Sequence, residues 1–243
     1  MMRKWIALNK EELEMLMVLM GQNELRDIAV IDEGFLPRED VAQGMLQRGF
    51  FVESEDGRTL HSFVHFVMWY VFNADCVLHI WEPDSSVCNI YFKSDVMILL
   101  SKRADLDEYV FYFVPFIPQA IGGFSYFCQN LTYRMTADSG TDVHEFVAET
   151  EPDSIEALLQ LLRKNGVGGV TDKSLALSVR GDVFDQPAYY GALLHTADGW
   201  MLAQAEDKAV TCSGVDGYEL IKKLSDWIIA THGSCISWGM KNE

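Results

Sequence analysis

The sequence predicts an α+β fold in which helices flank a central antiparallel sheet. Three observations support this prediction: strongly apolar helical segments come first, strand-length segments separated by turn residues follow from Cys76, and a last helical segment closes the chain. The 243 residues suffice for one large domain or two small, closely packed ones. Because 49% of the residues are apolar, the chain has ample material for a core, which excludes intrinsic disorder.

The first helix is predicted between Asn9 and Gly21. Asn9 is a suitable N-cap, and two glutamates follow in the first turn, where the helix dipole favours acidic side chains. The segment between the caps is apolar on almost every side, so the helix is either fully buried or made for a partner. Met15, Met17 and Met20 are our candidate partner-binding residues, because methionine adapts to varied apolar surfaces. The alternative is that these methionines belong to the core.

A second helix, a hairpin and a third helix are predicted next. The second helix begins at Pro37 and ends near Arg48, the hairpin turns at Gly57, and the third helix covers 61–72. Two helices followed by a hairpin resemble a winged-helix unit.

Residues 1–74 are therefore expected to form a helical, winged-helix-like segment, and residues 75–243 an antiparallel sheet with flanking helices, the two packed as one unit. Residues 1–60 carry twelve acidic and seven basic side chains, a net charge of −5. A winged helix that binds DNA presents a basic face. A transcriptional regulator is thus an alternative function, and nucleic-acid binding is not expected.

Strands dominate the rest of the chain. An antiparallel meander is predicted at 77–81, 87–93, 96–101 and 109–114. Residues 119–150 are less regular, with strands expected around 125–135 and 144–148. An amphipathic helix capped by Asp153 or Ser154 comes next, then strands at 175–180, 189–195, 200–205 and around 210–211, and a final helix at about 215–230. Both halves contain helices and a meander, which suggests an internal pseudo-twofold.

Charge and cysteine usage restrict the class of partner. The formal net charge of −17 repels phosphate backbones and anionic lipid headgroups, and suits a basic or mainly apolar protein partner. The five cysteines are dispersed without a C-x-x-C pair, which is typical of reduced thiols. The start of the chain has no apolar signal segment, and the longest apolar run, 63–72, is too short to span a bilayer. We therefore expect a cytoplasmic protein that binds no membrane.

No catalytic, cofactor-binding or metal-binding residues are predicted. His61 and His65 have a spacing that could hold a metal, but zinc needs further ligands, so we interpret both as helix-packing residues. The 138–141 stretch, Asp-Ser-Gly-Thr, matches one half of an aspartic protease site and lacks the second carboxylate. The glycines of 166–169 follow a helix and so indicate a helix stop. An enzyme with an unrecognised site is a further alternative.

The order of elements is similar to that of the EspG-like chaperones of type VII (ESX) secretion. The matching stretches are 46–50 (Leu-Gln-Arg-Gly-Phe), 180–182 (Arg-Gly-Asp), 196–200 (Thr-Ala-Asp-Gly-Trp) and the helix with Leu220, Leu224 and Ile228. The resemblance spans most of the chain and rests on pattern. It implies a cytoplasmic, cofactor-free chaperone or adaptor that shields an apolar, small helical secreted protein.

Overall fold

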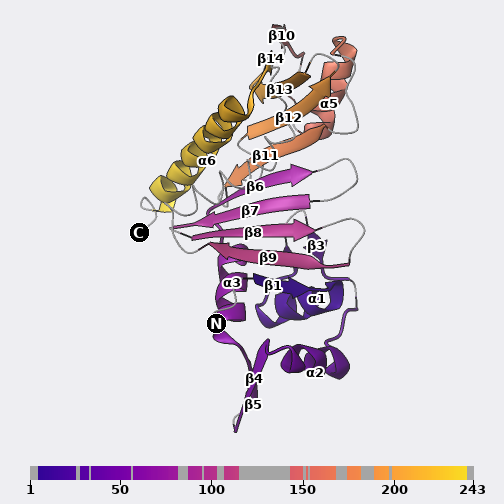
Figure 1. The fold of residues 1–243 in the computed structure, drawn as a ribbon, viewed down its shortest axis with the longest axis vertical. Coiled ribbons are helices and arrows are strands. Elements are labelled where there is room, and N and C mark those ends of the chain that lie inside the picture. The colour runs from indigo at the N-terminus through magenta and orange to yellow at the C-terminus, as the bar shows by residue number, and fades with distance from the viewer. Residues whose placement is uncertain are drawn as a thin grey trace.

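The computed structural model describes residues 5–25, 28–32, 34–55, 57–81, 87–94, 96–102, 107–114, 143–149, 152, 154–167, 174–181, 189–196 and 199–239. Within these residues one ten-stranded sheet runs through the molecule, and every neighbouring pair of its strands is antiparallel. Helices cover both faces of the sheet (Figure 1). The predicted α+β class is confirmed.

The sheet consists of two sets of five strands. The amino-terminal half-sheet contains β1 (Trp5–Leu8), β6 (Cys76–Trp81), β7 (Val87–Lys93), β8 (Val96–Lys102) and β9 (Tyr109–Val114). The carboxy-terminal half-sheet contains β10 (Val143–Val147), β11 (Leu175–Gly181), β12 (Tyr189–Thr196), β13 (Gly199–Glu206) and β14 (Ala209–Gly214). Their order is β1-β9-β8-β7-β6-β11-β12-β13-β14-β10. Each half is thus a four-stranded meander, with the strand that precedes it in the chain added at the outer edge.

Helix α1 (Lys10–Leu19) forms where the sequence predicts it. The Asn9 side chain accepts a hydrogen bond from the Glu12 N–H, and the Glu12 carboxylate accepts one from the Asn9 N–H, so both halves of a capping box are present. After the helix, Gly21 has φ +69°, a left-handed conformation that favours glycine.

The next elements also follow the prediction, with one addition. Helix α2 (Glu39–Gln47), the hairpin of β4 (Phe51–Ser54) and β5 (Gly57–Leu60), and α3 (Ser62–Phe72) occur in the expected order. A small unpredicted hairpin of β2 (Glu24–Leu25) and β3 (Ala29–Val30) lies between α1 and α2. The β4–β5 hairpin projects from the body of the molecule (Figure 1).

Two further helices belong to the second half of the chain. Helix α5 (Ile155–Lys164) is capped by the Ser154 hydroxyl, which accepts from the Ala157 N–H at 3.2 Å. Helix α6 (Gly217–Gly239) continues well beyond its predicted end near residue 230. The strand expected around 125–135 lies outside the described residues.

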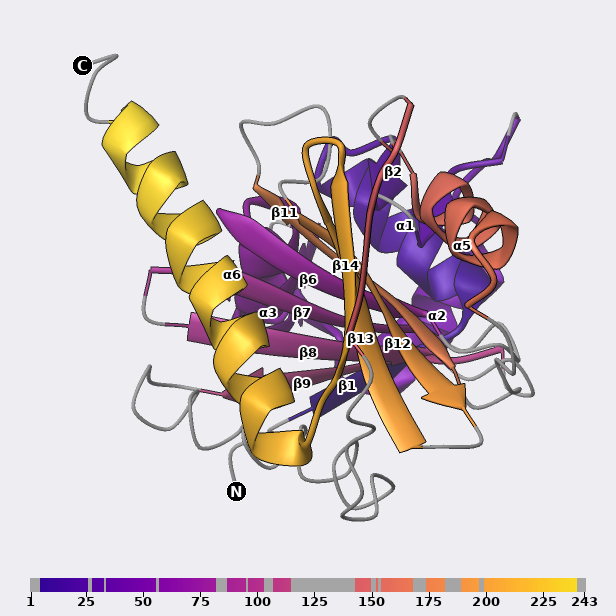
Figure 2. The same cartoon turned by 90° about the horizontal axis from the view of Figure 1, so that it is seen from above.

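The helices lie on opposite faces of the sheet. Side chains that alternate along each strand fall into different core clusters: Val77 and Tyr91 pack with α1 and α3, whereas Leu78 and Ile90 pack with α6. Helix α5 covers the first of these faces in the carboxy-terminal half-sheet. We name the two faces the α3/α5 face and the α6 face; Figure 2 shows α6 on one side of the sheet and α1 and α5 on the other.

Strand β1 connects the two predicted segments. It belongs to the 1–74 segment and pairs with β9 of the 75–243 segment, from Trp5 opposite Tyr112 to Leu8 opposite Tyr109. The division near residue 74 stays a prediction, and the two segments share one sheet.

Candidate partner-binding surface

The three methionines proposed for partner binding lie in and around the core. Met15 and Met17 are buried, and Met20 is partly buried against the same cluster. The exposed apolar residues of α1 are Val18 and Leu19. A partner-binding role for the three methionines stays a prediction, and Met20 is the member nearest to satisfying it.

A groove beside β1 is lined mostly by apolar residues. Its volume is about 310 Å³, and its lining residues are Trp5, Ile6, Ala7, Arg48 and Phe50. Trp5 is 55% exposed, which is a large exposed fraction for so apolar a side chain. We call this cavity the β1 groove.

Arg48 connects the elements around the β1 groove through hydrogen bonds and a ring contact. Arg48 Nη1 donates to both carboxylate oxygens of Glu12 at 2.6 Å, and Arg48 Nη2 donates to the carbonyl oxygen of Ala7 at 2.5 Å. The guanidinium also lies 4.6 Å from the centre of the Phe50 ring. Because β1 is an edge strand, this contact satisfies a carbonyl group that would otherwise attract another strand.

The same helix cap that begins α1 therefore positions the groove. Glu12 is buried, and it completes the capping box at Asn9 while it binds Arg48. A buried carboxylate needs such partners, since an unpaired charge inside a protein is strongly destabilising. The carboxylate that completes the cap of α1 thus also holds Arg48 in the groove.

An apolar row extends from the β1 groove across the α6 face. Trp5, Tyr112, Leu99, Ile90 and Leu78 are neighbours on successive strands from β1 to β6. Leu78 and Ile90 are fully buried, whereas Tyr112 is 42% exposed. At the end of the row next to β1, Trp5 and Tyr112 are therefore two adjacent, exposed aromatic side chains.

No local pattern in the sequence predicts this surface. The tetrapeptide of β1 is short, and its partner strand is far away in the chain, so nothing local showed that Trp5 would lie at a sheet edge. The available signal was an apolar run, Trp-Ile-Ala-Leu, placed directly before a strong N-cap.

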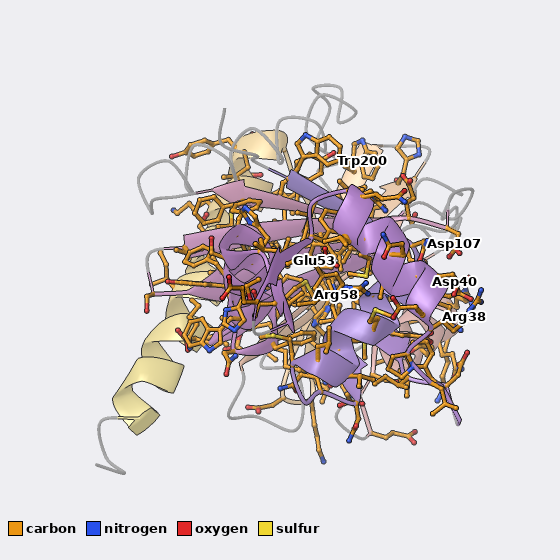
Figure 3. All side chains as sticks on the ribbon, turned by 90° about the horizontal axis from the view of Figure 1, so that it is seen from below. Arg38, Asp40, Glu53, Arg58, Asp107 and Trp200 are labelled. Carbon is orange, nitrogen blue, oxygen red and sulfur yellow. The ribbon has the colours of Figure 1, made fainter. Side chains whose placement is uncertain are left out.

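Every lysine and arginine that the structure describes in the predicted winged-helix segment is paired with an acid. Arg58 of β5 bonds to Glu39 at 2.6 Å and to Glu53 at 3.0 Å. Arg38 is paired with Asp40, and its guanidinium holds the pKa of that carboxyl below its usual range. Figure 3 shows Arg38 beside Asp40 and Arg58 beside Glu53. These arginines do not form the uncompensated basic face that DNA binding uses.

The two histidines whose spacing could hold a metal, His61 and His65, lie at the start of α3 and within it. The His61 ring caps α3 by accepting from the Phe63 N–H at 3.1 Å. Both His61 and His65 are exposed, so the packing role predicted for them is wrong. Within the described residues, no group of three or more His, Cys, Asp or Glu side chains could hold a metal ion. The 138–141 stretch lies outside the described residues, and Gly166, with φ +78°, follows α5 as predicted.

Comparison with known proteins identifies a structural relative. No family model matches the chain, and no curated protein matches its sequence. Among solved structures, the chain is similar to the type VII secretion system chaperone EspG5 of Mycobacterium tuberculosis, in a structure of its complex with the PE25–PPE41 dimer. The fold is that of EspG5. The TM-score is 0.62 at 13% sequence identity, and the alignment covers 93% of this chain and 96% of that chain.

This similarity confirms, at the level of the fold, the resemblance to EspG-like chaperones that the order of elements suggested. Among the described residues, no helix combines the length and the apolar character that crossing a bilayer requires.

Proposed function

We propose that this chain is a non-enzymatic protein-binding chaperone or adaptor of the cytoplasm, and that its partner is a small helical protein destined for secretion. The observation that carries the proposal is the fold shared with EspG5 over 93% of the chain, since the EspG5 structure contains a bound PE25–PPE41 dimer. The exposed aromatic surface at β1 and the net charge of −17 both suit a partner that binds through apolar contacts.

The proposed binding surface consists of the β1 groove and the adjoining Tyr112. Protein interfaces gain most of their affinity from a few aromatic and arginine side chains that become buried on binding. Trp5, Tyr112 and Arg48 are residues of this kind. A partner side chain inserted into the groove would cover Trp5 and contact Phe50 from the solvent side.

Two finer descriptions of the fold belong to the same proposal. The first is an internal pseudo-twofold, supported by a strand order that is the same outward from β6 and from β11. The second is the winged-helix interpretation of residues 1–74, which we take as a packing module, because its arginines Arg38 and Arg58 are paired with acids.

The test is recovery of the partner from the native cytosol, followed by affinity measurement with the purified pair. We expect a helical secreted protein at near-stoichiometric yield. Trp5→Ala should weaken its binding by about 2 kcal/mol or more, roughly 30-fold. Tyr218→Ala is the matched control, because Tyr218 is a 77% exposed aromatic residue on α6, away from the groove.

Circular dichroism melting would establish that both variants are folded. Equal affinities for the wild type and Trp5→Ala would remove the groove from the proposal. Failure to recover any secreted protein would contradict the chaperone function itself.

Alanine variants and mild oxidation distinguish the buried methionines of α1 from Met20, which is partly buried. Met17→Ala should cost about 2–5 kcal/mol of stability because its side chain is fully buried. Met20→Ala should cost much less and, if α1 contributes to binding, should lower affinity for the partner. In mild peroxide, Met20 should be oxidised before Met15 and Met17.

A further inference from the structure

A second cavity lies where the two half-sheets meet. Its volume is about 190 Å³, and it opens on the α3/α5 face beside β6 and β11, close to the end of α3. Its polar lining residues are Gln22, Glu24, His79, Tyr91 and Arg180. We call it the seam pocket. It is separate from the β1 groove, with which it shares no lining residue.

The strands that form this pocket are unusually polar on one face. On the α6 face, the central strands carry fully or almost fully buried aliphatic residues: Leu78, Ile80, Ile90, Leu177 and Val179. On the α3/α5 face, Asn89, His79 and Ser178 are neighbours on β7, β6 and β11, and all three are at least 98% buried. The same strands thus bury an apolar row on one side and a polar row on the other.

This polar row contributes less to stability than an aliphatic row would. A buried polar group contributes little net stability even when it is hydrogen-bonded, whereas an aliphatic side chain in its place would add stability directly. The Asn89 amide donates to the Tyr91 hydroxyl at 3.3 Å, and the His79 ring stacks on Trp81 with 5.3 Å between ring centres. These contacts hold the polar side chains in place beside the pocket. Several polar groups that converge on one cavity, beside apolar residues, are features of a small-molecule site.

The charges of the lining residues define the ligand chemistry. The half-buried Arg180 supplies a permanent positive charge and a planar set of N–H donors that matches a carboxylate or a phosphate. Tyr91 and His79 add a hydroxyl and an imidazole to the same wall. Glu24, the acidic side chain among the described lining residues, is exposed. In a chain with a net charge of −17, an anion would be retained only where such a local cation is present.

We propose that the seam pocket binds a small oxyanion-bearing molecule, a carboxylate or a phosphate, with Arg180 as the principal contact and with His79 and Tyr91 as supporting contacts. The volume of about 190 Å³ limits the ligand to a small molecule. This site goes beyond the proposed chaperone function and does not depend on it.

The experiment is thermal unfolding of the full chain with sodium succinate, sodium phosphate or sodium chloride at equal ionic strength. Succinate or phosphate should raise the melting temperature in a saturable manner, and chloride should not. Comparison of the two anions distinguishes a carboxylate ligand from a phosphate ligand. Arg180→Gln should abolish the increase, and Arg180→Lys, which keeps the charge but loses the planar donors, should weaken binding about tenfold or more. Arg58→Gln, which changes a cation on the projecting hairpin, should leave the increase intact.

Nuclear magnetic resonance keeps the proposal testable if the Arg180 variants do not fold. In the wild type, the imidazole signal of His79, assigned by its loss in His79→Gln, should shift on addition of the stabilising anion while the other five histidine signals stay in place. The proposal is overturned if neither anion stabilises the chain more than chloride, if Arg58→Gln loses the effect equally, or if the His79 signal does not move.

Discussion

The two half-sheets share one strand order but differ in how they are covered. On the amino-terminal half-sheet, α1 and α3 cover one face, and the opposite face becomes exposed toward β1, at Tyr112 and Trp5. On the carboxy-terminal half-sheet, α5 covers one face, and α6 packs on the other and extends onto β6 of the amino-terminal half-sheet. The same topology thus provides an open apolar edge in one half and a closed, two-sided core in the other. Covering helices, more than the sheet itself, decide where apolar surface stays exposed.

The packing of α6 on the sheet depends strongly on one side chain. Trp227 is buried and stacks on Tyr189 of β12, with 5.5 Å between the ring centres. Trp227→Ala should lower the free energy of unfolding by about 3–5 kcal/mol, because it removes a large buried aromatic group. Urea denaturation followed by circular dichroism is the measurement. A loss below about 1 kcal/mol would mean that α6 does not contribute to the folded core in solution.

Two glycines differ in how closely other atoms pack around them. A Cβ atom at Gly191 of β12 would lie 2.8 Å from Trp227 Cη2 and 3.2 Å from the Ala203 carbonyl oxygen. Gly191→Ala should therefore cost about 1–3 kcal/mol through overpacking. Gly44 in α2 has open space around it, so Gly44→Ala should instead stabilise by about 0.5–1 kcal/mol. Opposite signs in the same denaturation assay are expected, and equal effects would contradict the packing described.

Removing one helix cap from each half should lower the free energy of unfolding by a smaller amount. Asn9→Ala and Ser154→Ala each remove the N-cap side chain of a helix and should cost about 0.5–2 kcal/mol. The loss at Asn9 should be the larger, because Asn9 shares Glu12 with Arg48. A larger loss at Ser154 would mean that the Glu12–Arg48 pair is independent of the cap. Both free energies are measured by urea denaturation.

The smallest expected effect is a difference in reactivity between one cysteine of each half-sheet. Burial raises the pKa of Cys212 in β14 from 9.0 to about 11, so the thiol is neutral and protected in the folded state. Iodoacetamide at pH 8 should label the half-buried Cys88 of β7 before Cys212, as read by peptide mass spectrometry. Because the folded-state pKa is the higher one, the neutral thiol's contribution to stability is present below pH 9 and is lost between about 9 and 11. Early labelling of Cys212 would contradict its burial.

Most elements could be predicted because their signals are local. Asn9 with Glu12 determines the start of α1, and alternating residues with turns between them determine β6 to β9. Strand β1 was missed because its four residues are stabilised by pairing with β9, a contact distant in the chain. Helix α6 passes its predicted end through Gly233, whose cost of about 1 kcal/mol was insufficient to stop it.

The candidate site was less predictable than the fold. The apolar character of α1 was evident from the sequence, but the sequence could not show which side would be buried. The fold places Met15 and Met17 in the core and leaves Val18 and Leu19 at the surface. Trp5 and Arg48 come together only through tertiary packing, so no spacing in the sequence connects them.

The central position of the β6–β11 pair has a consequence during synthesis of the chain. Both meanders are built from neighbouring strands, which pair quickly, whereas β6 must wait for β11, a strand made much later. Until then the nascent chain has an open, apolar strand edge at β6, the kind of edge that promotes aggregation. The growing polypeptide is therefore most exposed to aggregation at β6, the strand that pairs with β11 in the middle of the finished sheet.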